Sequence, residues 1–459
     1  MLKTALCIVG ALAAGLLAFF GVNWWMGSGD LAEVELQRRL AREEGLPLEA
    51  DDLRPKPSVP DEDNAAIPFR EALKLVDRTY GSSVTPPLKK EWEAATKYVG
   101  TEFGFHPLKV APGAAQRIAE LLRPLDRPLE LIRSGSERPR CDWRRMYEEG
   151  VAMLLPEYAP MRQAVRILAA SAYVRVEKGD SKGAFAELLA CARIARLLRE
   201  EPVLIAQLVS AMIERHTLEA YRAILGGRPS DPFWLRAGEK LLSALGPPLD
   251  VRRALFGEVV MMRVSLDKMS SLEGLKEMGF RDEDLVWRRP NAHLRNRTEA
   301  ILLREARAAV SKLPKDPTDY ESARKALRPH GRTVEEALGA FFYAFDALGS
   351  GGGPHGDGPW ADIATGGASA LTQRRITQAF VAALDQAAKS GSAPCSLPLS
   401  GKDGIDPFGS GNTLRYRKTE DGFVVYGVGP NGLDEGGPAA GGRNQGDDIG
   451  VAFPIPKKL

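Results

Sequence analysis

The longest uninterrupted run of apolar residues lies near the start of the chain. Residues 5–25, ALCIVGALAAGLLAFFGVNWW, carry no charged side chain. As a helix, this run would span about 30 Å, the thickness of a bilayer's hydrocarbon core. Trp24 and Trp25 close it, where aromatic rings favour the membrane interface. The pattern predicts a single transmembrane anchor within residues 1–29, since no second run of this length follows.

The charges that flank this run predict its orientation. Lys3 precedes it, and the first charge after it is Asp30. This bias predicts an N-terminus inside the cell and the rest of the chain outside the cytoplasm. A cleaved signal peptide is the alternative, but its apolar core is usually about 7 to 15 residues long. We expect an uncleaved anchor, and both interpretations send residues 30–459 across the membrane.

Beyond the anchor, apolar residues recur at helical spacing over most of residues 30–348, the predicted helical domain. Met161–Lys178 and Ser181–Arg199 predict two helices, joined at Gly179 with Asp180 as the N-cap. A third helix is expected from Pro202 to Leu225. Short turns make such helices antiparallel neighbours. Their first turn resembles that of a tetratricopeptide-like hairpin, but no repeat of about 34 residues follows, so a bundle and a hairpin array both stay open.

Shorter segments complete the helical domain. We expect helices over residues 31–45, 65–76, 298–310 and 334–347, and the acidic and capping residues 61–64 precede the second of these. The glycine-dense stretch GSGGGPHGDG opens a predicted linker, residues 349–361. No Lys-Ser/Thr pair follows its glycines, which argues against a phosphate-binding loop.

The last part of the chain, residues 362–459, changes character. Residues 369–388 predict one helix, and residues 414–417 and 423–426 predict two strands. Between the strands, residues 419–422 predict a hairpin turn in which Gly422 supplies a positive φ. The fold class expected for the whole chain is therefore mainly α, with a small C-terminal α+β module.

The motifs of this module resemble a known family. The helix is followed by Asp406-Pro407-Phe408-Gly409, a Leu-Arg-Tyr strand, VYGVGPNG at 425–432, Gly436-Gly437 and Asp447-Asp448-Ile449. This order is similar to the soluble domain of the major pseudopilin of bacterial type II secretion systems. The resemblance covers about residues 370–453 and implies a bacterial inner-membrane protein whose bulk faces the periplasm. The first helix lacks that family's glutamate and processing pattern, so we interpret the module as borrowed and do not expect a pseudopilus.

In that family the terminal loop binds calcium, so the resemblance implies a calcium site here. Calcium prefers six to eight oxygen ligands, and a glycine-rich loop can turn its carbonyls inward. Asn431 stands where the family has its first loop aspartate, and Asp448 matches the aspartate before isoleucine. Asp434 and Asp447 are further candidates. The neutral amide of Asn431 should weaken such a site, and a solvated loop without an ion is the alternative.

Composition and motifs narrow the function classes. Lys and Arg number 62 against 60 Asp and Glu, which argues against nucleic-acid binding. None of the five histidines lies in an HExxH motif, and no GxSxG sequence is present. His216 follows Glu214 by two residues, a helical spacing that turns the two side chains apart. Cys141 and Cys395 could pair in an oxidising compartment, although two unpaired thiols are favoured.

These observations predict no catalytic residues, no bound cofactor other than calcium, and no identifiable small-molecule ligand. The first hypothesis is a non-enzymatic structural or interaction role in the cell envelope, with envelope or secretion proteins as partners. A helical peptide- or protein-binding adaptor is the second hypothesis. A hydrolase acting on envelope polymers is the third, and it would need two acids that converge in one pocket.

Overall fold

The computed structural model describes residues 30–78, 85–99, 114–277, 292–342, 359–409, 411–438 and 446–454. The predicted anchor, residues 5–25, lies outside these ranges, as do residues 349–358 of the linker. Within them, no helix is both long and apolar enough to cross a bilayer. The expected fold class is confirmed at this level: the described chain is mainly helical, with a small antiparallel sheet near its C-terminal end.

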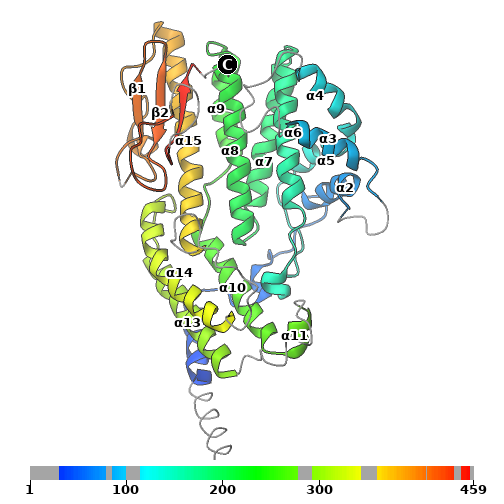
Figure 1. The fold of residues 1–459 in the computed structure, drawn as a ribbon, viewed down its shortest axis with the longest axis vertical. Helices are drawn as coiled ribbons and strands as arrows, with labels where there is room; N and C mark the ends of the chain where they lie inside the picture. Colours follow the sequence, from blue (N-terminus) through cyan, green and yellow to red (C-terminus); the bar gives the residue numbers. More distant parts are fainter. Residues whose placement is uncertain are drawn as a thin grey trace, which may run out of the picture.

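Three long helices form the middle of the molecule, as the sequence predicts: α6 (Tyr158–Glu177), α7 (Ser181–Leu198) and α8 (Leu204–Gly226). The Asp180 carboxylate accepts a hydrogen bond from the backbone nitrogen of Gly183 at 2.8 Å, which confirms its role as the N-cap of α7. All three helices pack on one another, and α9 (Pro232–Ala244) packs on α7. Two short turns make α6 and α8 parallel neighbours (Figure 1).

Shorter helices cover one side of α6 and α7 (Figure 1). The Asn64 side chain accepts from the backbone nitrogen of Ala66 at 3.0 Å, but the N-cap of the first of them is Ala65, which has no side-chain cap hydrogen bond, so the capping role expected for residues 61–64 is not confirmed. The sequence predicted the first of these helices over residues 65–76, but it did not separate the others, because prolines interrupt the pattern. The elements on this side are α2 (Ala66–Val76), α3 (Lys89–Tyr98), α4 (Ala114–Leu122) and α5 (Asp126–Ser136), with 3-10 turns η4 (Arg123–Leu125) and η5 (Tyr147–Ala152).

The lower part of the molecule in Figure 1 is built around α10 and has its own hydrophobic core. Residues 30–43 form a helix there, as expected, and α14 begins well before the predicted residue 334, even though it contains Pro329. A Cβ at Gly257 of α10 would lie 1.5 Å from the Pro202 carbonyl oxygen, so α10 touches the backbone just before α8. The elements are η1 (Ala50–Leu53), α10 (Val251–Met269), α11 (Leu272–Glu277), α13 (Ala292–Lys312) and α14 (Tyr320–Phe342).

The longest helix, α15 (Pro359–Ser390), joins the two cores. Trp360 and Ile363, near its start, belong to the lower core, whereas Ile376 and Phe380 belong to the core of α2–α9. It begins inside the predicted linker and packs against α8, α9 and α14. The predicted C-terminal module therefore shares its hydrophobic core with the helical domain.

The sheet covers the far side of α15, with strand order β1-β2-β3 and antiparallel pairing throughout (Figure 1). Both predicted strands are confirmed, and the third was missed. Gly422 in the hairpin has no positive φ, contrary to expectation. It is needed for close approach instead, because a Cβ there would lie 2.0 Å from the Phe453 carbonyl oxygen. The strands are β1 (Arg415–Lys418), β2 (Phe423–Gly427) and β3 (Ile449–Phe453), preceded by the 3-10 turn η6 (Gly401–Gly404).

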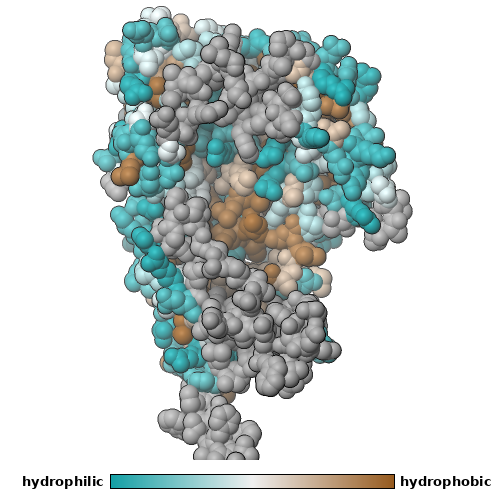
Figure 2. Space-filling model, in the orientation of Figure 1, coloured by the Kyte–Doolittle hydropathy of each residue, from teal (hydrophilic) through white to brown (hydrophobic). Residues whose placement is uncertain are grey.

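Several large apolar side chains are exposed near the middle of one face of the molecule (Figure 2). Leu154 is 75% exposed and Ile205 is 44% exposed. They lie before α6 and at the start of α8, two helices that begin at the same end of the bundle.

Buried charges fasten α8 to α15. Arg222 of α8 donates to the Gln373 side chain at 2.7 Å and to the Thr377 hydroxyl at 2.6 Å. Glu214 accepts two hydrogen bonds from Arg374, at 2.5 and 2.7 Å. Because these groups lose their hydration, each needs its partner in place.

Glu219, five residues after Glu214, has neighbours of its own. Its carboxylate lies 3.8 Å from the His216 imidazole and accepts from Arg215 at 2.8 Å. The expected divergence of Glu214 and His216 is thus confirmed. Burial alone would raise the pKa of Glu219, but His216, Arg215 and Arg222 outweigh it and hold this pKa at about 2.

This pKa predicts an acid-sensitive contribution to stability. Since the folded-state pKa lies below the unfolded value of 4.5, ionised Glu219 stabilises the fold above pH 4.5 by about 3 kcal/mol, and this contribution is lost as the pH falls toward 2. Urea unfolding at several pH values should show that Glu219→Gln is less stable than wild type near pH 7 and loses less on acidification. The exposed Glu420→Gln variant should follow wild type; equal acid slopes for all three proteins would contradict the assignment.

Candidate functional site

The helix formed by residues 30–43, which would directly follow the predicted anchor, is bound to α13 by polar side chains. Arg307 of α13 donates to the Gln37 side chain at 2.7 Å and to the Glu44 carboxylate at 3.0 Å. His293, near the start of α13, pairs with Asp30. These contacts hold the described part of this helix at residue 30 and again at residues 37 and 44.

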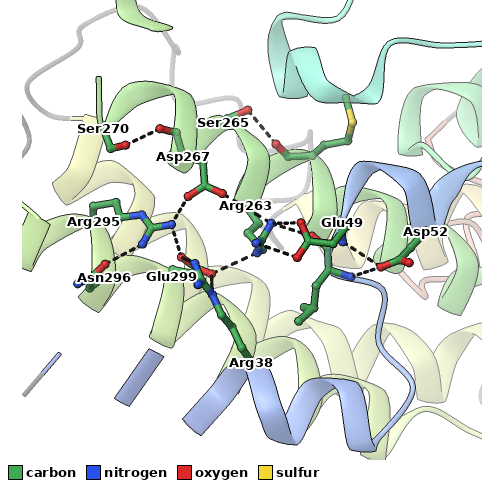
Figure 3. Close-up of polar contacts among 12 residues, drawn as sticks. Arg38, Glu49, Asp52, Arg263, Ser265, Asp267, Ser270, Arg295, Asn296 and Glu299 are labelled. Atoms are coloured by element: carbon green, nitrogen blue, oxygen red, sulfur yellow. Dashed lines mark hydrogen bonds and ion pairs between the residues drawn. The ribbon is translucent and has the colours of Figure 1, made fainter. Parts of the chain in front are cut away.

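The centre of this interface is a buried carboxylate, Glu299 (Figure 3). Its side chain is fully buried, and Arg38 donates to its two oxygens at 2.6 and 2.8 Å. Arg295 lies 2.8 Å from it, and the Nε of Arg263 on α10 lies 3.2 Å away. One carboxylate thus collects three guanidinium groups from three separate segments.

Arg263 extends these contacts to residues 48 and 49, which follow the helix at 30–43 (Figure 3). It donates to both oxygens of Glu49, at 3.2 and 3.1 Å, and to the Leu48 carbonyl oxygen at 2.9 Å. Asp267, one turn along α10, pairs with Arg295. The three arginines therefore face three carboxylates, those of Glu49, Asp267 and Glu299, so the charges balance. We call these six residues the Glu299 network.

A cleft of about 470 Å³ opens between residues 47–55, the 140–147 segment and the start of α10. Both signs of charge line it, together with aromatic rings. The residues that matter for its chemistry are Asp52, Arg54, Arg140, Cys141, Asp142, Trp143, Tyr147, Glu200, Glu201, Asp250, Arg252, Arg253 and Phe256.

Arg145, directly behind this cleft, organises its wall. Its guanidinium lies 2.6 Å from both the Glu157 and the Glu201 carboxylates. It also sits over the rings of Trp143 and Tyr158, 5.4 Å from each ring centre. The Tyr158 hydroxyl donates to Glu201. This packing pairs the charges of Arg145, Glu157 and Glu201 with one another.

The same pairing limits what the cleft can do chemically. Burial, with the nearby charge of Glu201, raises the pKa of the Cys141 thiol well above its usual value, so the thiol stays protonated. Burial also raises the pKa of Glu201, whose carboxylate is taken by Arg145 and Tyr158. Glu200 turns instead to Arg140, at 2.9 Å. None of the described residues that line the cleft offers a thiolate. Glu200 and Glu201, which are adjacent in the sequence, are directed at different partners.

Cys141 is buried and Cys395 is exposed, and both are free thiols in the structure.

The four predicted calcium ligands are only partly brought together. Asp434 and Asp448 both bind the 435–437 turn: Asp434 accepts from the Gly436 nitrogen at 3.1 Å, and Asp448 accepts from the Gly437 nitrogen at 2.7 Å. Asn431 closes its own turn by accepting from the Leu433 nitrogen at 2.8 Å. The Asp447 side chain is exposed.

Asp448 is the strongest of these candidates. It is fully buried, and its Oδ1 has no hydrogen-bond partner, whereas Oδ2 accepts from two backbone nitrogens. A buried carboxylate oxygen without a donor is a position that a cation would satisfy. Asp434, however, is engaged by Arg415 and Tyr426. Among the described residues, no three acidic, histidine or cysteine side chains converge as a metal group.

Asp406, the first residue of the Asp-Pro-Phe-Gly motif, has a structural role. Its carboxylate accepts from the Val428 nitrogen at 2.7 Å and from the Phe408 nitrogen at 3.1 Å. It therefore ties the segment before β1 to the end of β2.

No protein-family model, curated protein or solved structure matches the chain. The resemblance to the major pseudopilin therefore rests on the order of motifs described above.

Sequence reasoning did not find the Glu299 network. Arg38 and Glu299 are separated by 261 positions, and each looks like an ordinary charged residue on a helix. The only available signal was the high density of arginines in residues 295–307. In this stretch apolar residues recur at helical spacing, and some of the charged residues fall on the same, buried face of the helix.

Removing the charge of Glu299 should strongly reduce the stability of the fold. Glu299→Gln leaves Arg38, Arg263 and Arg295 without their shared buried charge, so the free energy of unfolding should fall by about 3 to 5 kcal/mol. Urea unfolding of the full-length protein measures this. The matched control, Glu120→Gln, removes an exposed partner of Arg117 and should cost under about 0.5 kcal/mol. Similar losses for the two variants would show that the network contributes no more than a surface pair.

Proposed function

We propose that this protein is held in a membrane by an anchor helix within residues 1–29, and that it has a non-enzymatic structural or interaction role in the cell envelope. The bulk of the chain would face the periplasm. The observation that carries the proposal is the Glu299 network: the helix of residues 30–43, which follows the apolar run of residues 5–25 in the sequence, is locked to the body by buried ion pairs. A locked connection suits a protein that presents surfaces at a set orientation to the membrane.

The shape of the molecule supports this role. The helix at 30–43 lies at one end of the long axis, and the sheet lies toward the other (Figure 1). A body attached at that end would extend away from a bilayer, with its flanks accessible to other proteins. The cleft wall supports the non-enzymatic part of the proposal, because its thiol is protonated and its buried acid is paired.

A link to secretion rests on the C-terminal residues. Their order of motifs resembles the major pseudopilin, and a long helix packed on a three-stranded antiparallel sheet accompanies them. The shared core with α8 and α9 supports a module that has become part of this body. A calcium ion at Asp448 belongs to the same proposal.

Fractionation of cells tests the anchor. The full-length protein should remain in the membrane fraction after carbonate extraction, and a C-terminal tag should be cleaved by protease added to spheroplasts. Leu16→Arg with Leu17→Arg should shift the protein to the soluble fraction, because each arginine at the centre of a helix opposes insertion by about 2.5 to 3.5 kcal/mol. Leu433→Arg, at an exposed position, is the control. Recovery of the intact wild-type chain in the cytosol would refute the placement.

Calorimetry tests the ion. If calcium binds at Asp448, millimolar calcium should release or absorb heat and raise the melting temperature, with a gain of about 1.4 kcal/mol at ten times the Kd. Asp448→Asn should remove both effects, whereas Asp421→Asn in the exposed hairpin should keep them. Neither heat nor a change in melting temperature for the wild-type protein would end the calcium proposal while leaving the anchor untouched.

A further inference from the structure

A second cavity, of about 450 Å³, lies where α14 begins beside α15. Its lining comes from residues 316–325, from Arg375 of α15 and from residues 402–407. These segments are far apart in the sequence, and an ion pair between Asp316 and Lys402, at 2.8 Å, joins two of them. The volume falls within the range of sites that hold small organic molecules.

Arg375 brings a buried charge to this cavity, and the described chain does not pair it. The residue is 7% exposed, and its one hydrogen bond to the described residues runs from Nη1 to the Ile405 carbonyl oxygen at 2.8 Å. Its Nε and Nη2 groups are not sealed from solvent, so they stay open to the cavity. Burial lowers the pKa of Arg375, even though three nearby aspartates oppose this change. A guanidinium that loses its hydration without gaining an anion is costly, so an anion that enters the cavity should bind it.

The acids of the cavity wall are already engaged. Lys402 and Thr318 bind both oxygens of Asp316, and they hold its pKa far below its usual value, so this carboxylate keeps its charge. Both oxygens of Asp406 accept from backbone nitrogens, at 3.1 and 2.7 Å. Glu321 pairs with two basic side chains of α14, at 3.1 and 3.3 Å. The fourth acid, at the start of α14, accepts from a backbone nitrogen at 3.1 Å. Each acid thus has a partner other than Arg375.

The free part of the guanidinium and the surrounding acids together select the kind of anion. Two parallel N–H groups of an arginine match the two oxygens of a carboxylate or of a phosphate. The four carboxylates of the wall repel any anion, and they repel a phosphate, with about −1.5 to −2 charges, more strongly than a carboxylate with one charge. A carboxylate therefore fits this cavity better than a phosphate does.

We propose that this cavity binds an organic monocarboxylate, whose carboxylate pairs with Arg375 and whose body fills the space between α14 and residues 402–407. The exposed ammonium groups of Lys325 and Lys402 line the same cavity and add to the attraction for an anion. This inference goes beyond the proposed envelope role, and it depends on neither the membrane anchor nor calcium.

A matched pair of small molecules tests the role of the charge. N-acetylleucine carries one carboxylate, and N-acetylleucinamide has nearly the same shape without a charge. Calorimetric titrations use the full-length protein, in neutral-lipid nanodiscs when it is recovered from the membrane fraction. The acid should bind at least about tenfold more tightly than the amide, and inorganic phosphate should bind more weakly than the acid.

Variants at the cavity separate binding from folding. Arg375→Gln should remove the preference for the acid over the amide. Arg375→Lys should keep part of this preference, because lysine retains the charge but not the fork of N–H groups. Asp316→Asn removes a repelling charge and releases Lys402, so the acid should bind about three- to tenfold more tightly. Loss of folding cannot produce such a gain, so this variant keeps the test valid if Arg375→Gln unfolds.

An ion pair elsewhere on α15 supplies the matched controls. Lys389 pairs with Asp385, and both side chains are exposed. Asp385→Asn and Lys389→Gln change the same charges outside the cavity, so they should leave the binding of every probe unchanged. Circular dichroism melts of each variant confirm that it is folded.

Several results would overturn the proposal. These are equal binding of acid and amide, undiminished binding of the acid to folded Arg375→Gln, weaker binding to Asp316→Asn, or no binding of N-acetylleucine and acetate up to about 20 mM. Phosphate that binds more tightly than the acid, and is lost in Arg375→Gln, would overturn the choice of a carboxylate and assign the cavity to a phosphate group. Failure of the membrane fractionation would refute the anchor alone, since the titrations are independent of it.

Discussion

Buried carboxylates that each hold two or more arginines fix how the helices of this protein are arranged. Glu187 of α7 accepts from arginines of α5 and α6, and Glu214 of α8 accepts from arginines after α7 and on α15. Glu299 of α13 accepts from Arg38 and forms ion pairs with arginines of α10 and α13. Apolar surface packs in many ways, but a buried charge without its partner costs several kcal/mol. An arrangement that separated any of these groups would leave charges unpaired, so the pairs select one packing among the alternatives that the hydrophobic pattern permits.

This constraint explains why the C-terminal helix belongs to the body. The sequence marks a glycine-rich stretch before it and a change to strands after it, which indicates a separate module. Yet α15 carries Arg374, whose carboxylate partner Glu214 is on α8, and Gln373 and Thr377, which receive Arg222. The composition of a linker describes the linker alone, and it does not reveal how tightly the flanking helix packs.

How much could be predicted follows from the range of the interactions. The helices α6–α8, the Asp180 cap and the β1–β2 hairpin depend on residues within a few positions of one another, and the sequence predicted them. The short helices α3–α5 were not separable, because prolines interrupt the periodicity, and α14 continues through Pro329, against local preference. The third strand and the Glu299 network depend on partners far away in the chain, such as Arg38 with Glu299, which no local pattern identifies. For the candidate calcium ligands, order along the loop gave Asp448 but could not show that Asn431 is used in its own turn.

A series of short contacts connects the helix at 30–43 to the bundle of long helices. The Glu299 network binds this helix to α10, and Gly257 of α10 lies against the carbonyl of Pro202, just before α8. Neither step passes through an exposed loop, so in the proposed anchored protein the bundle would keep a constant angle and height relative to the membrane. A flexible tether would let the bundle sample many positions and dilute its encounters with a partner in the same bilayer, whereas a rigid connection raises their effective concentration when the heights match and excludes partners whose heights do not. The buried charges of the Glu299 network would therefore restrict which partners reach the bundle, although they contact none of them.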